Sequence, residues 1–529
     1  MSNLLLSSQT KLVACITVLW LLLFHSSNAK HWKDSLERWI PKEIERSFQG
    51  IFYNIDPPGG IPGSVTAADS HYQPDYYYNW IRDAAITMDV VVTLYETATE
   101  PSQVKKLEDI LKSYVHYNYI IQRTPNPTGN LTTGGLGAAH YLLNGSAFTG
   151  SWCSVENDGP ALRAVAVMRF ANEYLRRHGD LSYVKKWIFN NETHPPTTVT
   201  RADLDYIARV WPDPCCGPWE TFFVVHFWDQ LLIRKALLQG AKFAKMLGYM
   251  DASSYYSKQA KELTSNMSKF ISQVHGVVLE SIDAPRDTIH ETFIDTSTIL
   301  AVLYGYNDDG FYAPDDPYVM NTANLLRLIY KDLFPVNRRR SQDEGVLFGR
   351  FPNGKKKIQS NGIYLANILL DNYDGIATGD GVKGNPWFLC TLGMARYYFE
   401  LAKRFSEYTT LTIHSRWMLP LLAHLSSYSS NPTPTILGEA PPEKHFQVGE
   451  TLQKAQLCQI AQALLTEADK IVYAVYRHVP ETGMLTEEIN RFTGFEQGAK
   501  NLTWSYDSFV TAIWSRNHSL QTFHSNCAF

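Results

Sequence analysis

Two glutamates far apart in the chain have the setting of an acid–base pair. Glu220 follows Pro218 and Trp219, just ahead of an amphipathic stretch over residues 226–249, and Glu487 lies near the other end of the chain. A carboxyl group beside an indole at the start of a helix is partly shielded from water, and desolvation raises a carboxyl pKa. Such a group is suited to be a general acid, and an ionised carboxylate opposite it to be a general base. Together these roles are the chemistry of glycosidic bond hydrolysis.

Several other stretches place aromatic rings beside groups that hydrogen-bond to hydroxyls. The guanidinium of Arg82 is a planar fork of donors, Asp83 is an acceptor, and Tyr76 and Trp80 supply walls for a sugar ring. The stretches are Pro74-Asp75-Tyr76-Tyr77-Tyr78-Asn79-Trp80-Ile81-Arg82-Asp83, Gly150-Ser151-Trp152, Asn157-Asp158-Gly159-Pro160-Ala161-Leu162-Arg163, Gly384-Asn385-Pro386-Trp387-Phe388-Leu389-Cys390, and Thr486-Glu487-Glu488 with Leu502-Thr503-Trp504-Ser505-Tyr506.

Each stretch also has a purely structural explanation. Asp83 is well placed as a carboxylate at a helix N-terminus, with Arg82 as its surface partner. Asp158-Gly159-Pro160 is a helix-start signal. Trp152 and Trp387 could anchor the core, and two adjacent carboxylates such as Glu487 and Glu488 most often mark a solvated surface.

Helical periodicity dominates the chain that must position these residues. Gly- and Pro-containing clusters separate the periodic segments, and strand-like alternation is scarce. The segments cover residues 31–50, 84–97, 104–121, 160–176, 226–249, 252–272, 320–333, 388–404, 409–427, 448–476 and 505–515. So many helices suit either a solenoid or a closed barrel, and a solenoid should show a repeat of about 20–50 residues. Because we find no repeat, the sequence predicts an all-α (α/α)6 barrel whose loops form a funnel at one end.

Composition narrows the class of function. The 529 residues are 45% hydrophobic, with a formal net charge of −4 and charges of both signs along the chain. Because no basic stripe is present, nucleic acid is excluded as a partner. The aromatic content of 13%, with 30 Tyr and 13 Trp, suits either sugar-stacking platforms or a Tyr-rich core. No C-x-x-C or H-E-x-x-H motif occurs, so we expect no metal and no cofactor.

The N-terminus predicts secretion. Lys11 precedes an apolar run over residues 12–24, and small residues follow up to Ala29, so residues 1–29 are interpreted as a cleaved signal peptide. An uncleaved membrane anchor is the alternative. Asn-X-Ser/Thr sequons, which mark candidate glycosylation sites, begin at Asn130, Asn144, Asn191, Asn266, Asn501 and Asn517.

Cleavage would remove Cys15 and leave an even number of cysteines. These are Cys153, Cys215, Cys216, Cys390, Cys458 and Cys527. An even number in an oxidising compartment permits disulfides, but the pairing cannot be read from the sequence. The adjacent Cys215 and Cys216 are not expected to bond to each other.

These motifs, in this order, resemble the fungal glucoamylases, family 15 of the glycoside hydrolases, over about residues 31–516. The resemblance implies one (α/α)6 catalytic domain over residues 30–529, without a starch-binding module. It also implies an inverting, exo-acting glucan 1,4-α-glucosidase that releases β-D-glucose from the non-reducing ends of starch, dextrin or glycogen. Glu220 matches the general acid and Glu487 the general base. The positions that match substrate-binding residues are Tyr76, Trp80, Arg82, Asp83, Ser151, Trp152, Trp219, Arg350, Trp387 and Trp504.

The chain departs from the family pattern around the acid. Residues 212–225 keep the Trp and the first Glu, but Thr221 stands where the family has a second, substrate-contacting Glu. The alternatives are genuine divergence and a paired frameshift in the coding sequence.

A second departure is an apparent insertion at Asn353 to Leu369, between Arg350 and Trp387. It is either a surface loop, which could displace Arg350 from the pocket, or a mis-annotated coding segment.

The resulting prediction is a secreted, glycosylated, monomeric exo-hydrolase acting on α-glucans such as starch, maltooligosaccharides and glycogen. It has no membrane partner once the signal is cleaved, and vacuolar or cell-surface locations are alternatives to the medium. The competing hypothesis is a catalytically impaired relative that binds α-glucan without hydrolysing it. A third hypothesis, a barrel hydrolase of another linkage such as a trehalase, is disfavoured by the Leu-Thr-Trp-Ser-Tyr and Asn-Pro-Trp-Phe-Leu-Cys motifs.

Overall fold

The computed structural model describes residues 31–282, 293–353, 358–359, 362–363, 369–370, 384–429 and 446–527. The predicted signal peptide lies outside these residues, as does much of the predicted insertion at 353–369.

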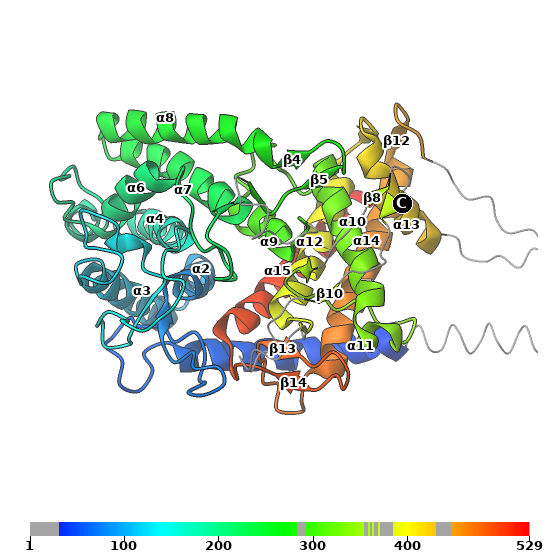
Figure 1. The fold of residues 1–529 in the computed structure, drawn as a ribbon, viewed down its shortest axis with the longest axis horizontal. Helices are drawn as coiled ribbons and strands as arrows, with labels where there is room; N and C mark the ends of the chain where they lie inside the picture. The colour runs from blue at the N-terminus through cyan, green and yellow to red at the C-terminus, as the bar shows by residue number, and fades with distance from the viewer. Residues whose placement is uncertain are drawn as a thin grey trace, which may run out of the picture.

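In the part of the chain so described, six helices form a closed ring (Figure 1). Each helix packs against the next around the ring, and the last packs back against the first. In ring order they are α2 (Ile81–Thr97), α4 (Asp158–His178), α7 (Phe227–Met246), α9 (Thr296–Gly305), α12 (Phe388–Glu407) and α15 (Thr503–Cys527).

A second layer of helices covers this ring from outside. The layer contains α3 (Pro101–Ile121), α6 (Val199–Val210), α8 (Met250–Asn266), α10 (Pro317–Leu333), α13 (Leu419–Ser429) and α14 (Lys454–His478). Each outer helix lies in a connection between consecutive ring helices, and all except α13, which packs on α10 and α14, pack against a ring helix that they join. The short helices α5 (Leu181–Tyr183) and α11 (Pro335–Arg338) lie in the connections. Alternation of inner and outer helices around a closed ring is the predicted (α/α)6 barrel.

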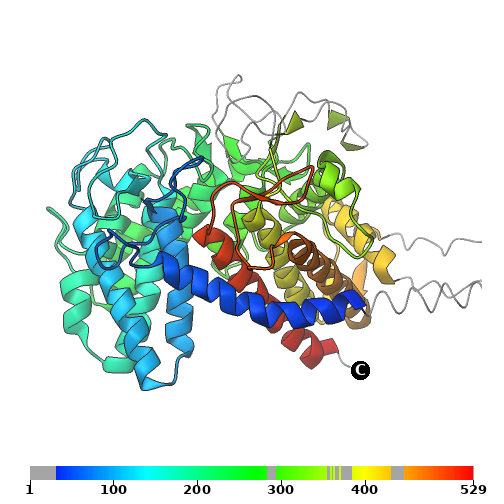
Figure 2. The same cartoon turned by 90° about the horizontal axis from the view of Figure 1, so that it is seen from below.

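The outer layer is completed by the N-terminal helix, residues 31–54. Trp39 packs edge-on against Phe509 of α15 with ring centroids 5.1 Å apart, and Trp32 lies 5.5 Å from Tyr473 of α14. Figure 2 shows this helix in dark blue where it crosses the red α15. The start of the described chain is thereby fixed to its end.

Burial explains why the sequence periodicity found some helices and missed others. The outer α8 buries one face, so its apolar residues recur with the helical period. The inner α9 was not predicted, because a helix buried on nearly all sides has no polar stripe to reveal it. The outer α6 was also missed, as it is only 12 residues long.

Two predicted helix starts were wrong. Residues 409–427 were expected to be helical throughout, but β11 (Thr410–Thr412) pairs antiparallel with β12 (Thr451–Gln453), and the helix begins only at Leu419. Threonine is β-branched and favours extended backbone, which explains the strand. The same pairing delays the start of α14 from the predicted 448 to Lys454.

Strands are short and all pair antiparallel. The other pairs are β1 (Asn79–Trp80) with β2 (His140–Tyr141), β3 (Val225–His226) with β6 (Ser281–Ile282), β4 (Ile271–Ser272) with β5 (Val277–Val278), β7 (Pro352–Asn353) with β10 (Leu369–Leu370), β8 (Ile358–Gln359) with β9 (Gly362–Ile363), and β13 (Glu488–Ile489) with β14 (Glu496–Gln497). They brace the loops at the helix ends. Among the helices described, none is long and apolar enough to cross a membrane.

Candidate active site

The ring helices begin at the same end of the barrel, and their first turns surround one cavity. Asp83 lies in the first turn of α2, Asp158 begins α4, Asp295 caps α9, and Trp387 and Trp504 stand at the starts of α12 and α15. Helix N-termini carry positive partial charge, which accounts for the carboxylates gathered there. The barrel itself closes the floor of the cavity.

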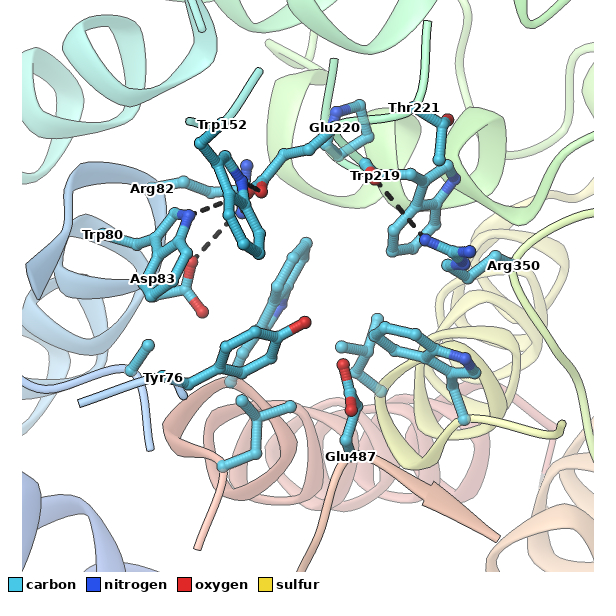
Figure 3. A pocket seen from close by; sticks show the side chains of 16 residues that line it. Tyr76, Trp80, Arg82, Asp83, Trp152, Trp219, Glu220, Thr221, Arg350 and Glu487 are labelled. Carbon is cyan, nitrogen blue, oxygen red and sulfur yellow. Dashed lines mark hydrogen bonds and ion pairs between the residues drawn. The ribbon is translucent and has the colours of Figure 1, made fainter. Parts of the chain in front are cut away.

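The cavity holds about 340 Å³, within the roughly 300–1,000 Å³ usual for small-molecule sites. Its walls carry the predicted pair, Glu220 and Glu487, on opposite sides (Figure 3). The lining residues are Ala67, Tyr76, Trp80, Arg82, Asp83, Trp152, Pro218, Trp219, Glu220, Thr221, Arg350, Trp387, Leu389, Glu487, Leu502 and Trp504. Every predicted site residue is among them except Ser151, whose exposed side chain lies outside the lining.

Arg82 is the electrostatic centre of one wall. Its Nη1 donates to Glu156 Oε2 at 2.8 Å and its Nη2 to Glu220 Oε1 at 3.2 Å. Its Nε lies 3.3 Å from Asp83 Oδ2. Asp158 Oδ2 is 3.5 Å from Nη1. All of these groups are largely buried. Arg82 and Asp83 are therefore not an ion pair on the protein surface, which was the structural explanation of their sequence motif. Burial raises the pKa of Asp83 to about 6, against the opposing effect of Arg82.

Glu220 is held by donors on three sides. Besides Arg82, the indole of Trp80 donates to its Oε1 at 2.7 Å, and the indole of Trp152 donates to its Oε2. Burial works to raise the pKa of Glu220, but Arg82 above all, and then side-chain hydrogen bonds with Glu156 and Trp152, leave it below its ordinary value. The predicted rise in its pKa was therefore wrong, chiefly because the charge of Arg82 lies against the carboxylate.

The loop that carries Glu220 is held in place by contacts with His226. His226 Nε2 lies 3.0 Å from the carbonyl oxygen of Phe222, and its Nδ1 lies 3.1 Å from Glu280. Glu280 raises the pKa of His226 to about 9, so the imidazole is charged at neutral pH and donates both bonds. Gly217 packs on this ring with φ 63°, and a Cβ there would come within 2.7 Å of it, so only glycine fits. Residues 212–225 thus form an ordered segment despite their divergence.

Glu487 is fixed on the opposite wall by the backbone. Its Oε2 accepts from the N–H of Ala499 at 3.3 Å, and its carbonyl oxygen accepts from Phe388 N at 3.2 Å. The neighbouring Glu488 instead accepts from the Asn385 amide at 2.8 Å. Neither carboxylate is exposed. The pair is therefore not a solvated surface: Glu487 lines the cavity and Glu488 braces a loop behind it.

Indole rings complete the cavity. Trp219 stacks on Trp504 with centroids 6.4 Å apart and donates to the carboxylate of Asp295 at 2.9 and 3.0 Å. The guanidinium of Arg350 lies 5.2 Å from the ring centroid of Trp387 and 5.8 Å from that of Trp219. Arg350 therefore lines the cavity and has not been displaced by the segment that follows it.

Several groups that support the site were not predicted from the sequence, namely Glu156, Asp295, His140 and His226. Glu156 directly precedes the Asn157-Asp158-Gly159 helix start, which is the signal that could have revealed it. Asp295 and His226 belong to no recognised motif. Among the described residues, no group of His, Cys, Asp and Glu side chains is arranged to hold a metal ion.

Disulfides join Cys153 to Cys216 and Cys458 to Cys527, whereas Cys215 and Cys390 are buried thiols. The expectation that Cys215 and Cys216 do not bond to each other is confirmed. The first disulfide ties the loop of Trp152 to the loop of Glu220, the two residues that meet in a hydrogen bond.

Removing this disulfide by Cys153→Ser with Cys216→Ser should lower both stability and kcat. The bridge spans 63 residues, so the chain-entropy relation gives about 4 kcal/mol of unfolding free energy. Cys458→Ser with Cys527→Ser is the matched control, since it spans 69 residues away from the cavity. Denaturant unfolding should show similar losses for the two variants, and only the first should lose kcat. Equal kcat values would refute a positioning role for this bridge.

Trp152→Phe should lower kcat/KM by about 10-fold. A hydrogen bond to a charged group contributes about 1.5–3 kcal/mol, and the lower end of that range corresponds to about a 10-fold change in rate. The lower end applies because Trp152 is 43% exposed. Trp187→Phe is the control, as Trp187 packs on Tyr119 outside the cavity lining. An unchanged kcat/KM for Trp152→Phe would show that its hydrogen bond to Glu220 is not used.

Known proteins match this chain along most of its length. The profile described as "Glycosyl hydrolases family 15" matches residues 50–514. The chain is 31% identical over 495 residues to a glucoamylase of Blastobotrys adeninivorans, covering 92% of this chain and 73% of that protein. It is also 31% identical to glucoamylase 1 of Rhizopus oryzae, covering 91% and 71%. Among solved structures, the glucoamylase of Saccharomycopsis fibuligera superposes with a TM-score of 0.75 at 27% identity, covering 92% of this chain and 96% of that one.

Proposed function

Because the chain belongs to family 15 of the glycosyl hydrolases, we propose that Glu220 and Glu487 are its catalytic acid and base. The protein is a glycoside hydrolase, an exo-acting glucan 1,4-α-glucosidase. The alternative of an α-glucan-binding protein without turnover is not favoured.

One observation supports the pair above all. Glu220 and Glu487 face each other across one cavity, Glu220 held by Arg82 and two indoles on its own wall and Glu487 by the backbone N–H of Ala499. In an inverting mechanism Glu220 protonates the glycosidic oxygen on one face of the sugar, and Glu487 takes a proton from a water on the other face. Arg82 and Asp83 lie beside Glu220 and would hold the hydroxyls of the terminal glucose.

The shape of the cavity suits attack on chain ends. Its floor is the packed barrel, and its inner walls, including Trp80, Trp219 and Trp504, are almost fully buried. Trp152 and Thr221 are the exposed residues of the lining. A chain can therefore enter by one end but cannot lie across the site, which favours release of glucose from non-reducing ends.

Proton NMR of the products tests this mechanism. With maltotriose and fresh enzyme, the first glucose released should be the β-anomer, which then equilibrates with the α-anomer. Initial α-glucose would be consistent with a hydrolase but would refute the assignment of Glu487 as the general base. If the folded enzyme released no glucose, the activity itself would be refuted.

We also propose that the protein is secreted, N-glycosylated and monomeric. The sequon residues Asn130, Asn144, Asn191 and Asn517 have exposed side chains, whereas Asn266 and Asn501 are partly buried. The disulfides suit an oxidising compartment. Glycosidase digestion of protein from the culture medium should lower its mass, and sedimentation should give the mass of one chain.

A further inference from the structure

Glu156 is a buried carboxyl group for which the two-carboxylate mechanism has no use. It is 2% exposed and lies in the loop before α4, where its backbone N–H donates to Gly137 at 2.8 Å. Its Oε2 accepts the bond from Arg82, no donor among the described residues reaches its Oε1, and its carboxyl lies within hydrogen-bond reach of the Glu220 carboxyl. An ionised oxygen in that position would be costly, because nothing replaces the water it lost.

Glu156 and Glu220 share one cation. They bind Nη1 and Nη2 of the same guanidinium, at 2.8 and 3.2 Å. The other groups facing them are Asp83 and Asp158, which lie 3.3 and 3.5 Å from Arg82, and His140, which stacks on Trp80. Burial lowers the pKa of His140 to about 4, so its ring is neutral at neutral pH.

The charges of this cluster do not balance if every carboxyl is ionised. Arg82 would then be the single cation among four carboxylates, in a region from which water is largely excluded. Buried like charges relieve this imbalance by keeping a proton. Burial and the charge of Glu220 raise the pKa of Glu156 well above its ordinary value, while the pKa of Glu220 is lowered.

We propose that Glu156 and Glu220 share one proton, which Glu156 retains until Glu220 delivers it to the glycosidic oxygen. The proposal rests on Glu220 being the general acid. It accounts for a general acid that lies against a guanidinium, because the proton belongs to the pair rather than to Glu220 alone. Glu156 is then a positioning residue for the proton and does not touch the substrate.

The proton transfers are as follows. The O–H bond of Glu156 breaks as one forms on Glu220, and the Glu220 proton passes to the glycosidic oxygen. The electrons of the C1–O bond stay on that oxygen, while the attacking water bonds to C1 and gives a proton to Glu487. Afterwards Glu487 releases its proton to solvent and the Glu156–Glu220 pair takes one up, so each turnover is balanced.

The first test is the pH dependence of kcat/KM for Glu156→Gln on maltotriose. The amide keeps the shape of a protonated carboxyl but cannot share a proton with Glu220. It also removes the repulsion between the two carboxylates that keeps a proton on Glu220. The basic limb of the profile should move down by about one pH unit, so that activity above the limb falls about 10-fold relative to the wild type. A limb that stays in place, with or without a uniform loss of rate, would overturn the proposal.

Glu43→Gln is the matched control. Glu43 is also a fully buried carboxyl whose pKa is raised by burial, to about 8, but it lies on the N-terminal helix beside Arg46 and outside the cavity lining. Its substitution should leave both limbs of the profile unchanged. A shift equal to that of Glu156→Gln would assign the effect to any buried carboxyl and overturn the proposal.

A second measurement does not depend on activity or on the folding of Glu156→Gln. Infrared difference spectra can follow protonated carboxyl groups while the wild type and Glu220→Gln are titrated. If the proton is shared, Glu220→Gln removes the charge that retains it, and one carboxyl band should lose its proton at lower pH than in the wild type. Identical titrations would overturn the sharing. A shifted band in an enzyme that releases no glucose would instead refute the proposed function and leave the sharing intact.

Discussion

Replacing Glu220 by Gln should lower kcat on maltose by about 10²–10⁴-fold, because proton donation by a positioned acid contributes that much to the rate. KM should change little, since the amide can still accept bonds from Arg82 and the Trp80 indole. The loss should be far smaller on α-glucosyl fluoride, because fluoride departs with little help from an acid. Steady-state kinetics on both substrates give the result.

Glu487→Gln separates the two roles. A general base is needed whatever the leaving group, so this variant should lose rate on the fluoride as well as on maltose. Glu43→Gln serves again as the remote buried carboxyl and should keep wild-type rates. If Glu220→Gln lost rate equally on both substrates, Glu220 would not be the acid.

Arg82→Met should destabilise the protein by about 3–5 kcal/mol at neutral pH, the usual cost of leaving buried charges unpaired. The variant leaves Asp83, Glu156, Asp158 and Glu220 facing one another without a cation. Met keeps much of the side-chain length, so the lost charge dominates the effect. Denaturant unfolding at pH 7 measures the change in free energy.

The sign of the pH dependence identifies the cause. Without Arg82, these carboxyls should have folded-state pKa values above their unfolded values. Groups of this kind contribute full stability below the unfolded pKa, near 4, and lose it as the pH rises through the folded pKa. The deficit of Arg82→Met should therefore be smaller at pH 4.5 than at pH 7. A deficit independent of pH would mean that packing around the side chain, and not charge, is what Arg82 supplies.

The sequence predicted the barrel because most of its inner and outer helices carry a periodic apolar pattern and no repeat indicates a solenoid. It could not reveal α9, whose surroundings are apolar on nearly every side. The site was predicted as far as recognisable motifs extend, since Arg82, Glu487 and Trp504 lie within motifs. Glu156 and His226 act through contacts with distant segments, and the only local signal for either is the helix start that follows Glu156.

The pKa of Glu220 shows a different limit. The sequence places an indole next to Glu220, and the natural inference was an apolar neighbour. In the structure, Trp219 directs its N–H to Asp295, while Trp80 and Trp152, from other parts of the chain, direct theirs to Glu220. The charge of Arg82 lowers the pKa of Glu220 most, and the Trp152 bond adds to that effect. Only the three-dimensional arrangement brings both groups to this carboxylate.

The closed ring also has a consequence for synthesis. The last ring helix, α15, packs against the first, α2, and the guanidinium of Arg82 rests 5.4 Å from the ring of Trp504. Asn54 joins the same seam through bonds of 2.7 Å to Thr503 Oγ1 and 2.8 Å to the carbonyl of Asn501. Contacts between such distant segments form late in folding. A nascent chain therefore has no working site until α15 has left the ribosome, and a ribosome-bound chain stalled before Thr503 should hydrolyse no glucan.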